Sequence, residues 1–427
     1  MIDLKRLRQD PQGSRASLLR RRDASVAQAV DALLELDRDR RELLVRVEGL
    51  KAERNAASEE VARRKRAKEP ADELMARLKA SGDEVKALDA RLRELETTLE
   101  GQAMALPNFP AEGTPDGDAS ANRVVRTWGD PPAFDFQPKA HWELADALGM
   151  LDLPAGAKLT GSGFPVFRGY GAKLGRALAA FMLDLHTREH GYVEVAVPYL
   201  VNRATLTGTG QLPKFEDDLY GVPADDLFLI PTAEVPVTNL HRDEILESSR
   251  LPLGYVACTP CFRREAGAHG KDTRGLIRVH QFDKVELVRF ARPEESDAEH
   301  ERLTGHAEAV LQRLGIPYRV VELAAGDTGF ASARTFDLEV WAAGVGTWLE
   351  ASSSSTFTDF QARRANIRFR REPRAKPEFV HTLNASGVAF PRTIIALLEN
   401  NQSADGSVRV PAALVPYLGV DRLAPTA

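Results

Sequence analysis

Cysteine is almost absent from this chain of 427 residues, in which Cys258 and Cys261 are the only two. Two thiols cannot supply the disulfide framework of a small secreted domain, and their scarcity fits a reducing compartment. The C-x-x-C spacing leaves zinc open as an alternative, with His269 and His280 nearby. Because no second cysteine pair exists, we favour packed positions on a strand.

Long apolar runs are missing as well. No stretch of about 18 uncharged apolar residues could span a bilayer, and the opening residues MIDLKRLRQDP lack the apolar centre of a signal peptide. We therefore expect a cytoplasmic protein with no membrane partner. The net charge of −5 requires any surface for nucleic acid to be local.

Proline is rare from Asp23 to Gly101, where Pro70 is the only one and charged residues are dense. The second half of this segment has apolar residues at alternating spacings of three and four, namely Leu74, Leu78, Val85, Leu88, Leu92, Leu95 and Leu99. The first half repeats the pattern with a lapse around Arg40, through Val26, Val30, Leu33, Leu36, Leu43, Val47, Leu50, Ala57 and Val61. Such spacing is typical of a coiled-coil seam. It predicts an antiparallel hairpin over 26–102, roughly 45 to 60 Å long, with Pro70 in the first turn of the second helix.

A basic run, RRKRAK, lies at residues 63–68, near the predicted tip of this hairpin. The first 100 residues hold 23 Lys and Arg against 21 Asp and Glu, so this part is slightly basic while the remainder is acidic. Several cations at one exposed end could meet nucleic-acid phosphates, which makes Arg63, Arg64, Lys65 and Arg66 candidates for binding them. A solvated hairpin end is the alternative.

Beyond the hairpin, the composition changes to the Pro-rich and Gly-rich segment PNFPAEGTPDGDASA at 107–121, which predicts a linker. We expect an N-terminal domain at 1–103, a linker at 104–125 and a second domain at 126–427. Two domains also suit the length of the chain, because a single core rarely grows beyond about 250 to 300 residues.

The second domain shows one helix signal followed by repeated strand signals. An amphipathic helix is predicted around 174–185, and strands are predicted at 191–200, 227–230, 255–262, 276–290, 318–323, 335–341 and 347–352. Strands without regular intervening helices indicate an antiparallel sheet flanked by helices, so the expected fold class is α+β. Neither GxGxxG nor GxxxxGK[ST] occurs, so a nucleotide would need another cradle.

The segment FRREAGAHGKDTRGLIRVHQFDKVEL, residues 262–287, carries ten charged residues among a few apolar ones. By strand period, Arg263 and Glu265 share one face of the strand that enters the loop 266–274. On the returning strand, one face would carry Arg278, His280, Phe282, Lys284 and Glu286. Glu350 could join them from a neighbouring strand. This lining suits a ligand with phosphates, a flat base and an ammonium group, although a solvated, cross-paired hairpin has the same spacing.

Five segments together resemble the bacterial seryl-tRNA synthetase family of class II aminoacyl-tRNA synthetases, over essentially the full chain. CFRREAGAHGKDTRGLIRVHQFDKVE is similar to the family's motif 2, GYVEVAVPYL to motif 1, and TLNASGVAFPRTIIALLENNQ to motif 3. PTAEVPVTNLH and EASSSSTFTDFQARR resemble segments more particular to the serine enzyme. One motif alone is weak evidence, but five in this order behind a helical arm are a specific combination.

The resemblance implies a serine–tRNA ligase that uses ATP and Mg²⁺. Such an enzyme activates L-serine to seryl-adenylate and transfers the serine to tRNA(Ser), and to tRNA(Sec) where that tRNA is present. The resemblance assigns the arm to the long variable arm of the tRNA. It also implies a homodimer, for which the apolar helix and strand at 174–200 would serve as the two-fold interface. No segment is spare for an editing domain.

The resemblance also assigns roles to residues of this chain. The serine-binding residues would be Thr232, Ala233, Glu234, Arg263, Glu286 and Ser386, with Glu286 on the serine ammonium and Ser386 near its hydroxyl. The ATP-binding residues would be Arg263, Arg264, Glu265, Val279, Phe282, Glu350, Ala351, Ser352, Ser353 and Arg392. Glu350 and Ser353 would also hold magnesium, which prefers hard oxygen donors. The serine run at 352–355 could instead be mere low complexity.

Three positions depart from the family's pattern. Arg264 stands where many members carry serine, Ala385 where glycine is common, and Pro391 where others have glycine. Neither Arg264 nor Pro391 replaces a contact residue, although both bear on the local strand and helix geometry, whereas Ala385 could narrow the serine pocket. Two rival functions stay open. A carrier-protein ligase would share the catalytic domain, although the long arm counts against it, and a non-catalytic dimer scaffold would not need the charged residues of the site.

Overall fold

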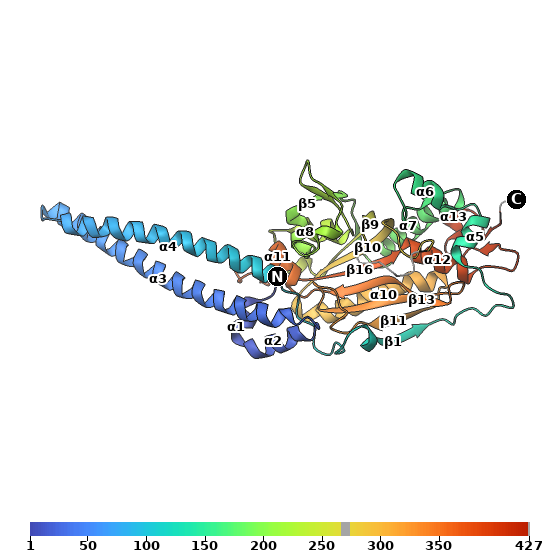
Figure 1. Cartoon of the computed structure of the whole chain (residues 1–427), viewed down its shortest axis with the longest axis horizontal. Coiled ribbons are helices and arrows are strands. Elements are labelled where there is room, and N and C mark those ends of the chain that lie inside the picture. Colours follow the sequence, from blue (N-terminus) through green and yellow to red (C-terminus); the bar gives the residue numbers. More distant parts are fainter. Residues whose placement is uncertain (266–273, 426–427) are drawn as a thin grey trace. The chain divides into compact units, whose positions relative to one another are not determined.

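The computed structural model describes residues 1–265 and 274–425. The chain divides into two compact units, which Figure 1 colours along the sequence. The helical unit comprises residues 2–19 and 23–107, and the sheet unit comprises residue 1 together with 20–22 and 108–427. Within the described ranges, none of the helices combines the length and the apolar character that a bilayer span requires.

The helical unit contains α1 (Leu4–Gln9), α2 (Pro11–Leu19), α3 (Ser25–Ala67) and α4 (Asp72–Ala105). The two long helices α3 and α4 lie side by side along their length (Figure 1). The buried apolar residues of α3 and α4 that follow the predicted seam are Val26, Val30, Leu33, Val47, Val61, Val85, Leu92 and Leu99. The predicted antiparallel hairpin is therefore confirmed.

Some of the charged residues of the hairpin form ion pairs between its two helices. At Arg40, where the apolar pattern lapses, the guanidinium lies 2.9 Å from the Glu96 carboxylate. Two further pairs join the helices, Arg46 with Glu84 at 2.7 Å and Lys51 with Asp89 at 2.8 Å. The prediction for Pro70 was wrong. Lys68 adopts a left-handed conformation (φ 59°) that ends α3, and α4 begins at Asp72, so Pro70 lies in the link.

The sheet unit is built on one eight-stranded sheet. In spatial order its strands are β1 (Arg123–Trp128), β11 (Tyr318–Glu322), β12 (Arg334–Ala342), β13 (Thr347–Thr356), β16 (His381–Ala389), β10 (Gln281–Ala291), β9 (Leu253–Phe262) and β4 (Val193–Glu194). Every neighbouring pair is antiparallel except β4 with β9. The predicted α+β class with an antiparallel sheet is confirmed.

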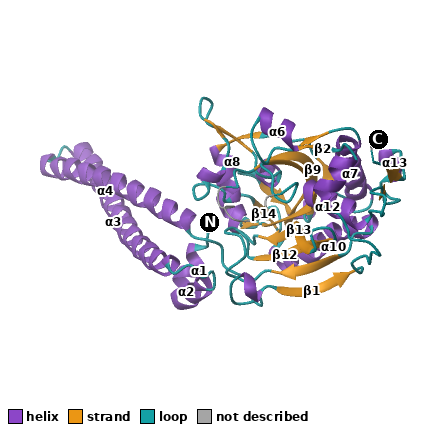
Figure 2. Cartoon of the chain, turned by 45° about the vertical axis from the view of Figure 1, so that its right-hand side comes forward, coloured by secondary structure: helices purple, strands orange, loops and turns teal. Residues whose placement is uncertain are grey.

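Helices cover both faces of this sheet (Figure 2). The α-helices of the sheet unit are α5 (His141–Ala147), α6 (Leu153–Leu159), α7 (Tyr170–Arg188), α8 (Arg203–Thr209), α9 (Glu234–Thr238), α10 (Ser296–Leu314), α11 (Phe360–Ala365), α12 (Phe390–Asn400) and α13 (Val415–Leu418). Short strands form the smaller sheets, namely β2 (Leu151–Asp152), β3 (Val166–Phe167), β5 (Leu200–Asn202), β6 (Gly221–Val222), β7 (Leu227–Leu229), β8 (Ile245–Glu247), β14 (Arg368–Arg370), β15 (Glu378–Phe379), β17 (Val408–Arg409) and β18 (Arg422–Leu423).

Strand β10 separates two apolar clusters because its side chains alternate. Val285 and Leu287 join the cluster that contains residues of α7, α10 and α12. Val288 and Phe290 point the opposite way, into the cluster with residues of α9 and α11. Lys284 and Glu286 share the parity of Val288, so the strand carries its charged residues toward the α9 and α11 face.

Two predicted strands are shorter than expected. Within 191–200 the strand residues are Val193 and Glu194, with Leu200 opening β5. The predicted strand at 276–290 begins only at Gln281, because the backbone before it has other partners. The N–H of Leu276 donates to Nε2 of His141 at 3.0 Å, and the N–H of His280 donates to the carbonyl of Gly163 at 2.9 Å.

Candidate active site

Two neighbouring cavities lie where four central strands of the sheet come together. The first cavity has a volume of about 290 Å³ and the second about 260 Å³. Both are lined by Arg263 after β9, Lys284 of β10, Glu350 of β13 and Ser386 of β16. Because they share these four residues, the two cavities form one continuous site.

An arginine stacked on a ring forms one wall of the first cavity. The guanidinium carbon of Arg263 lies 5.3 Å from the ring centroid of Phe282. The N–H of Arg263 donates to the carbonyl of His280 at 2.8 Å, and Nδ1 of His280 lies 2.9 Å from the carbonyl of Arg263. These contacts continue the pairing of β9 with β10 and hold Arg263 over the ring. The pair can accept a planar group by stacking and an anion by charge.

A second arginine borders the same cavity from the start of α12. Nη1 of Arg392 donates to the carbonyl of Glu350 at 2.5 Å and lies 3.3 Å from its carboxylate. Pro391 occupies the first turn of the helix, where a missing N–H costs no helical hydrogen bond. This departure from the family's pattern therefore suits the beginning of α12.

Glu265 and Arg278 form an ion pair at the edge of the first cavity, and both line it. Glu265 has a φ of 52°, a left-handed conformation that is uncommon for a glutamate. The predicted loop residues 266–273 lie outside the described residues, so the loop itself is not placed.

Lys284 and Glu286 form a buried ion pair, 5% and 1% exposed. The ammonium of Lys284 also donates to the Thr232 hydroxyl at 3.0 Å. The side-chain amide of Asn384 donates to Oε1 of Glu286 at 3.0 Å. Glu286 lines neither cavity, whereas its partner Lys284 lines both and its partner Asn384 lines the second.

Glu234, at the start of α9, lines the second cavity and is 7% exposed. Nε2 of Gln361 donates to Oε1 of Glu234 at 2.6 Å, and the Thr382 hydroxyl donates to Oε1 of Gln361 at 2.7 Å. Burial, and next the charge of Glu286, raises the pKa of Glu234 to about 7. The carboxyl group is therefore poised to change its protonation state near neutral pH.

Hard oxygen donors gather between β12 and β13. Glu350 and Ser353 line the second cavity, and Asp337 pairs with Ser353 across the strands. Oδ1 of Asp337 is buried without a hydrogen bond, and burial together with the Glu350 carboxylate raises the pKa of Asp337. These oxygens fit a hard cation such as Mg²⁺. The described residues contain no cluster of three or more His, Cys, Asp or Glu able to hold a metal, so further oxygens would have to come from a ligand.

The serine run of β13 is divided between the two faces of the sheet. Ser353 and Ser355 line the second cavity. On the opposite face, the hydroxyl of Ser352 donates to the carbonyl of Ser386 at 2.6 Å and so ties β13 to β16. Each of these serines has a defined place, which argues against mere low complexity.

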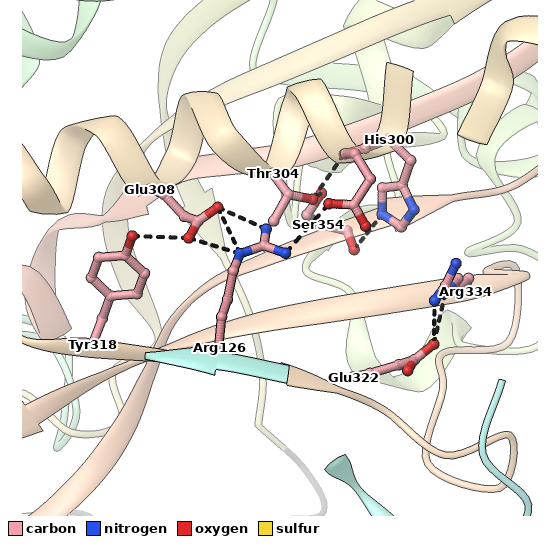
Figure 3. A network of polar contacts seen from close by, with 9 residues as sticks. Arg126, His300, Thr304, Glu308, Tyr318, Glu322, Arg334 and Ser354 are labelled. Carbon is pink, nitrogen blue, oxygen red and sulfur yellow. Dashed lines mark hydrogen bonds and ion pairs between the residues drawn. The ribbon is translucent and has the colours of Figure 1, made fainter. Parts of the chain in front are cut away.

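Helix α10 holds the remaining serine from the far side of the sheet (Figure 3). Nε2 of His300 lies 3.0 Å from the carbonyl of Ser354, and the hydroxyl of Thr304 lies 2.9 Å from that of Ser354. The same helix is tied to the sheet edge by Arg126 with Glu308 at 2.7 Å, and by Tyr318 with Glu308 at 2.9 Å. This network supports the strand that carries Ser353 into the site.

Most residues predicted for the site come together. Those that line one or both cavities are Thr232, Glu234, Arg263, Glu265, Val279, Phe282, Glu350, Ala351, Ser353, Ser386 and Arg392. Those that line neither are Ala233, Arg264, Glu286 and Ser352. The side chain of Arg264 lies over the ring of Tyr220, 5.1 Å from its centroid, and its Nε donates to the carbonyl of Leu219 at 2.8 Å. Its side chain is therefore held away from both cavities.

Sequence reasoning assigned no role to Gln361, Asn384 and Asp337, and it included Lys284 in the predicted lining without a specific contact. The spacing of two residues placed Lys284 on the same strand face as Glu286, which could have indicated that Lys284 lies in the site. Gln361 and Asn384 gave no signal, because their positions depend on which strands and helices are neighbours. Both lie within segments quoted for the resemblance, but a single amide in such a segment has no spacing to mark it.

The predicted tip residues lie in the last turns of α3. Nε of Arg63 lies 2.7 Å and Nε of Arg64 2.9 Å from the Glu60 carboxylate. These hydrogen bonds lower the pKa of Glu60 to about 2. Two cations of the run are therefore partly neutralised by their own helix.

The two cysteines lie on β9 and contribute no reactive group. Cys261 is completely buried. Burial raises the pKa of Cys258 to about 12, so its thiol stays protonated at neutral pH.

Comparisons with known proteins agree with this geometry. The model of the seryl-tRNA synthetase N-terminal domain matches residues 1–110, and that of the class II tRNA synthetase core domain (G, H, P, S and T) matches residues 214–401. A serine–tRNA ligase of Desulfitobacterium hafniense is 55% identical over 422 residues, with 99% of each chain covered. One of Gemmatimonas aurantiaca is 54% identical over 420 residues, with 98% of this chain and 99% of that protein covered.

A solved structure extends the likeness to three dimensions. The seryl-tRNA synthetase of Pyrococcus horikoshii, complexed with ATP, is 38% identical, has a TM-score of 0.95 and is covered fully in both chains. More than half of the residues are identical to those of serine–tRNA ligases over nearly the whole length of the chain, which is enough to assign its family. The chain belongs to the seryl-tRNA synthetase family, within the class II aminoacyl-tRNA synthetases.

Proposed function

We propose that this chain is a serine–tRNA ligase, which activates L-serine with ATP and transfers it to tRNA(Ser). The observation that carries the proposal is the continuous pair of cavities, with Arg263 and Lys284 at their junction. One cavity has the stacking surface and arginines that a nucleotide needs. The other has the carboxyl and hydroxyl groups that a small amino acid needs.

In the first cavity, the adenine of ATP would stack on Phe282 beside Val279, with Arg392 on its other face. Glu265 would accept a hydrogen bond from the adenine amino group. Arg263 would hold the α-phosphate, and its planar guanidinium can bind phosphate oxygens in pairs. Arg264 would act through its backbone, because its side chain is engaged elsewhere.

Glu350 and Ser353 would hold Mg²⁺ together with phosphate oxygens. The cation would neutralise charge on the phosphates and orient them. The fit rests on the oxygen donors in this structure and on the buried, unpartnered Oδ1 of Asp337 beside Ser353.

In the second cavity, L-serine would be bound by Thr232, Glu234 and Ser386, with Glu286 close behind. Ala233 and Ser352 would support these residues from the buried side. A pocket that hydrogen-bonds a hydroxyl rejects alanine, because the analogue leaves buried polar groups without partners.

The chemistry requires positioning and charge neutralisation more than a side-chain nucleophile. A carboxylate oxygen of L-serine attacks the α-phosphorus of ATP and pyrophosphate leaves. Arg263 lies at the junction of the cavities and would neutralise charge on both reacting groups. In the second step, a hydroxyl of the terminal adenosine of the tRNA attacks the serine carbonyl and AMP leaves.

The helical hairpin would grip the long variable arm of tRNA(Ser), and of tRNA(Sec) where that tRNA is present. Backbone recognition requires reach and cations rather than base reading, and the hairpin offers both. The active form would be a cytoplasmic homodimer. The exposed side chains of Val193, Tyr199 and Leu200 support the dimer, because 54%, 46% and 43% of their surfaces are accessible on the single chain.

Serine-dependent ATP–pyrophosphate exchange, measured beside tRNA charging on the same preparation, tests the function. We expect both activities. Exchange without charging of any tRNA would favour a carrier-protein ligase, and neither activity would favour a scaffold. Either result would overturn the proposal.

A further inference from the structure

The amino-acid end of the site contains two carboxyl groups with different partners. Glu286 is already neutralised by Lys284 and receives a hydrogen bond from Asn384. Glu234 has a single side-chain donor, Nε2 of Gln361 at 2.6 Å, among the described contacts of its carboxyl group. Glu234 lines the second cavity, whereas Glu286 does not.

Gln361 cannot reverse its amide to suit Glu234. Its Oε1 accepts from the Thr382 hydroxyl at 2.7 Å, and its Nε2 also donates to the carbonyl of Thr209 at 3.2 Å. All three groups are buried. The amide therefore always offers its N–H to Glu234, and the second carboxyl oxygen is left for the cavity.

Charge balance at this end changes when an amino acid enters. The carboxylate of the ligand is matched by Arg263, which lines both cavities. The ammonium requires a negative partner, but the charge of Glu286 is already matched by Lys284. Placing an unmatched cation in a partly dehydrated pocket is costly. A second carboxylate in reach of the cavity would remove that cost.

We propose that L-serine binding releases one proton from Glu234, so that Glu234 enters the complex as the carboxylate partner of the substrate ammonium. The O–H bond of the carboxyl group breaks, the proton passes to the solvent, and the carboxylate accepts a hydrogen bond from the ammonium. This inference rests on the proposed function, because it takes L-serine as the ligand. It makes Glu234 a group whose charge reports whether an amino acid is bound.

The surroundings of Glu234 favour the neutral acid when the site is empty. The charged groups that face it are Glu286 and Lys284 from β10 and Arg263 from the end of β9. Burial and the charge of Glu286 outweigh the opposing effects of Gln361, Lys284 and Arg263, and the pKa rises to about 7. An arriving ammonium adds a cation and reverses this balance.

Isothermal titration of the full chain with L-serine tests the proposal. Titrations in PIPES and in imidazole, whose ionisation enthalpies differ strongly, give the number of protons released from the difference in heat. For a group that titrates near pH 7, we expect release of about 0.9 proton at pH 6 and about 0.1 proton at pH 8.

Two variants and a matched control sharpen the test. Glu234→Gln, which mimics the neutral acid, should release no proton at any pH and bind L-serine more weakly. Gln361→Leu removes a donor that favours the carboxylate, so its proton release should persist to higher pH. Glu308→Gln removes a buried carboxylate bound to Arg126 on the other face of the sheet (Figure 3), and its proton release should match that of the unmodified chain.

A heat of L-serine binding that is the same in both buffers at pH 6 would overturn the inference while leaving the proposed function intact. That result would mean that Glu234 keeps the same protonation state with and without bound L-serine. Proton release that persists in Glu234→Gln would also overturn it. The absence of both binding heat and serine-dependent exchange would refute the proposed function itself.

Discussion

Lys284 and Glu286 stand two residues apart on β10 and form an ion pair that is almost completely shielded from water. Burying two charges costs several kcal/mol in desolvation for each, so the pair is stable only while both members are present. Lys284 also donates to the Thr232 hydroxyl, and Glu286 also accepts from the Asn384 amide. The pair thus connects β10 to two other parts of the amino-acid site.

Glu286→Ala should sharply reduce activation of L-serine. The substitution leaves the Lys284 ammonium buried without its carboxylate and removes a negative charge from behind the serine pocket. We expect a loss on the order of 2 kcal/mol or more in transition-state stabilisation, about 30-fold in kcat/KM for L-serine in pyrophosphate exchange.

The double variant Lys284→Met with Glu286→Leu provides the control. It removes both charges, so thermal stability should recover relative to Glu286→Ala while exchange stays low. Exchange at the unmodified rate in either variant would contradict the role of Glu286.

The chain should activate L-serine in strong preference to alanine, threonine and cysteine. Ser386 and Thr232 line the second cavity, and an analogue without the hydroxyl would leave polar groups of the pocket without a partner. Exchange rates measured at equal, subsaturating amino-acid concentrations give the ratio of kcat/KM values. Equal exchange rates with alanine and serine would contradict the predicted specificity.

Replacing residues 26–102 with a short linker should leave serine activation nearly intact and reduce tRNA charging by orders of magnitude. Every residue that we propose for ATP or L-serine lies within the sheet unit, at or beyond Thr232. Exchange and charging are measured on the same preparation. If the shortened chain charges tRNA as well as the full chain, the assignment of the arm is wrong.

Neutralising the basic tip separates reach from electrostatics. Substituting Arg63, Arg64, Lys65 and Arg66 with glutamine should weaken charging less than the deletion does. It should also flatten the salt dependence of tRNA binding, by nearly one unit of slope for each phosphate that the tip no longer binds, if the RNA behaves like duplex. Arg63 and Arg64 share Glu60, so Lys65 and Arg66 should account for the larger part. An unchanged salt dependence would show that the tip binds no phosphate.

The chain should be a homodimer in solution. Val193, Tyr199 and Leu200 are large, exposed side chains in the segment that follows α7, as expected of a surface that a second copy covers. Sedimentation equilibrium at micromolar concentration should give twice the mass of the chain. Tyr199→Asp with Leu200→Asp should shift the distribution toward monomer, and a monomeric unmodified chain would count decisively against this prediction.

His300 should make the fold sensitive to mild acid. It is buried under the sheet against the Ser354 carbonyl, and burial lowers its pKa to about 4. Since the pKa of an unfolded histidine is near 6.5, the contribution of neutral His300 to the free energy of unfolding is complete above pH 6.5 and is lost as the pH falls toward 4. Between pH 6.5 and 5.5 the free energy of unfolding should fall by about 1 kcal/mol.

Urea unfolding of the unmodified chain and of His300→Gln at both pH values measures this contribution. The amide can still donate to the Ser354 carbonyl but does not titrate. The variant should therefore lose about 1 kcal/mol less than the unmodified chain over this interval. Identical changes in the two proteins would contradict it.

Local patterns predicted those parts of the fold that depend on nearby residues. The spacing of Leu92 and Leu99 predicted the seam of α4, because helix faces follow from short-range periodicity. Strand parity likewise placed Lys284 and Glu286 on one face. The same reasoning wrongly predicted a strand at residues 276–280. The backbone N–H groups of Leu276 and His280 donate instead to His141 and Gly163, which are distant in the sequence.

The site shows the same division. Arg263, Glu350 and Arg392 were predicted from the quoted motifs, and the structure brings them to one cavity. Gln361 was not predicted, because its importance depends on Glu234 and Thr382 being its neighbours in space. Sheet order and helix docking determine such neighbours, and neither leaves a short-range pattern in the sequence.

The position of β16 has a consequence for how the protein is made. Among the eight strands of the main sheet it is the last along the chain, yet it lies between β13 and β10 and joins the two halves. A nascent chain on the ribosome can pair β9 with β10, and β12 with β13, before His381 has emerged. Ser386 and Asn384 belong to β16, so the amino-acid pocket can be completed only after most of the chain has been synthesised.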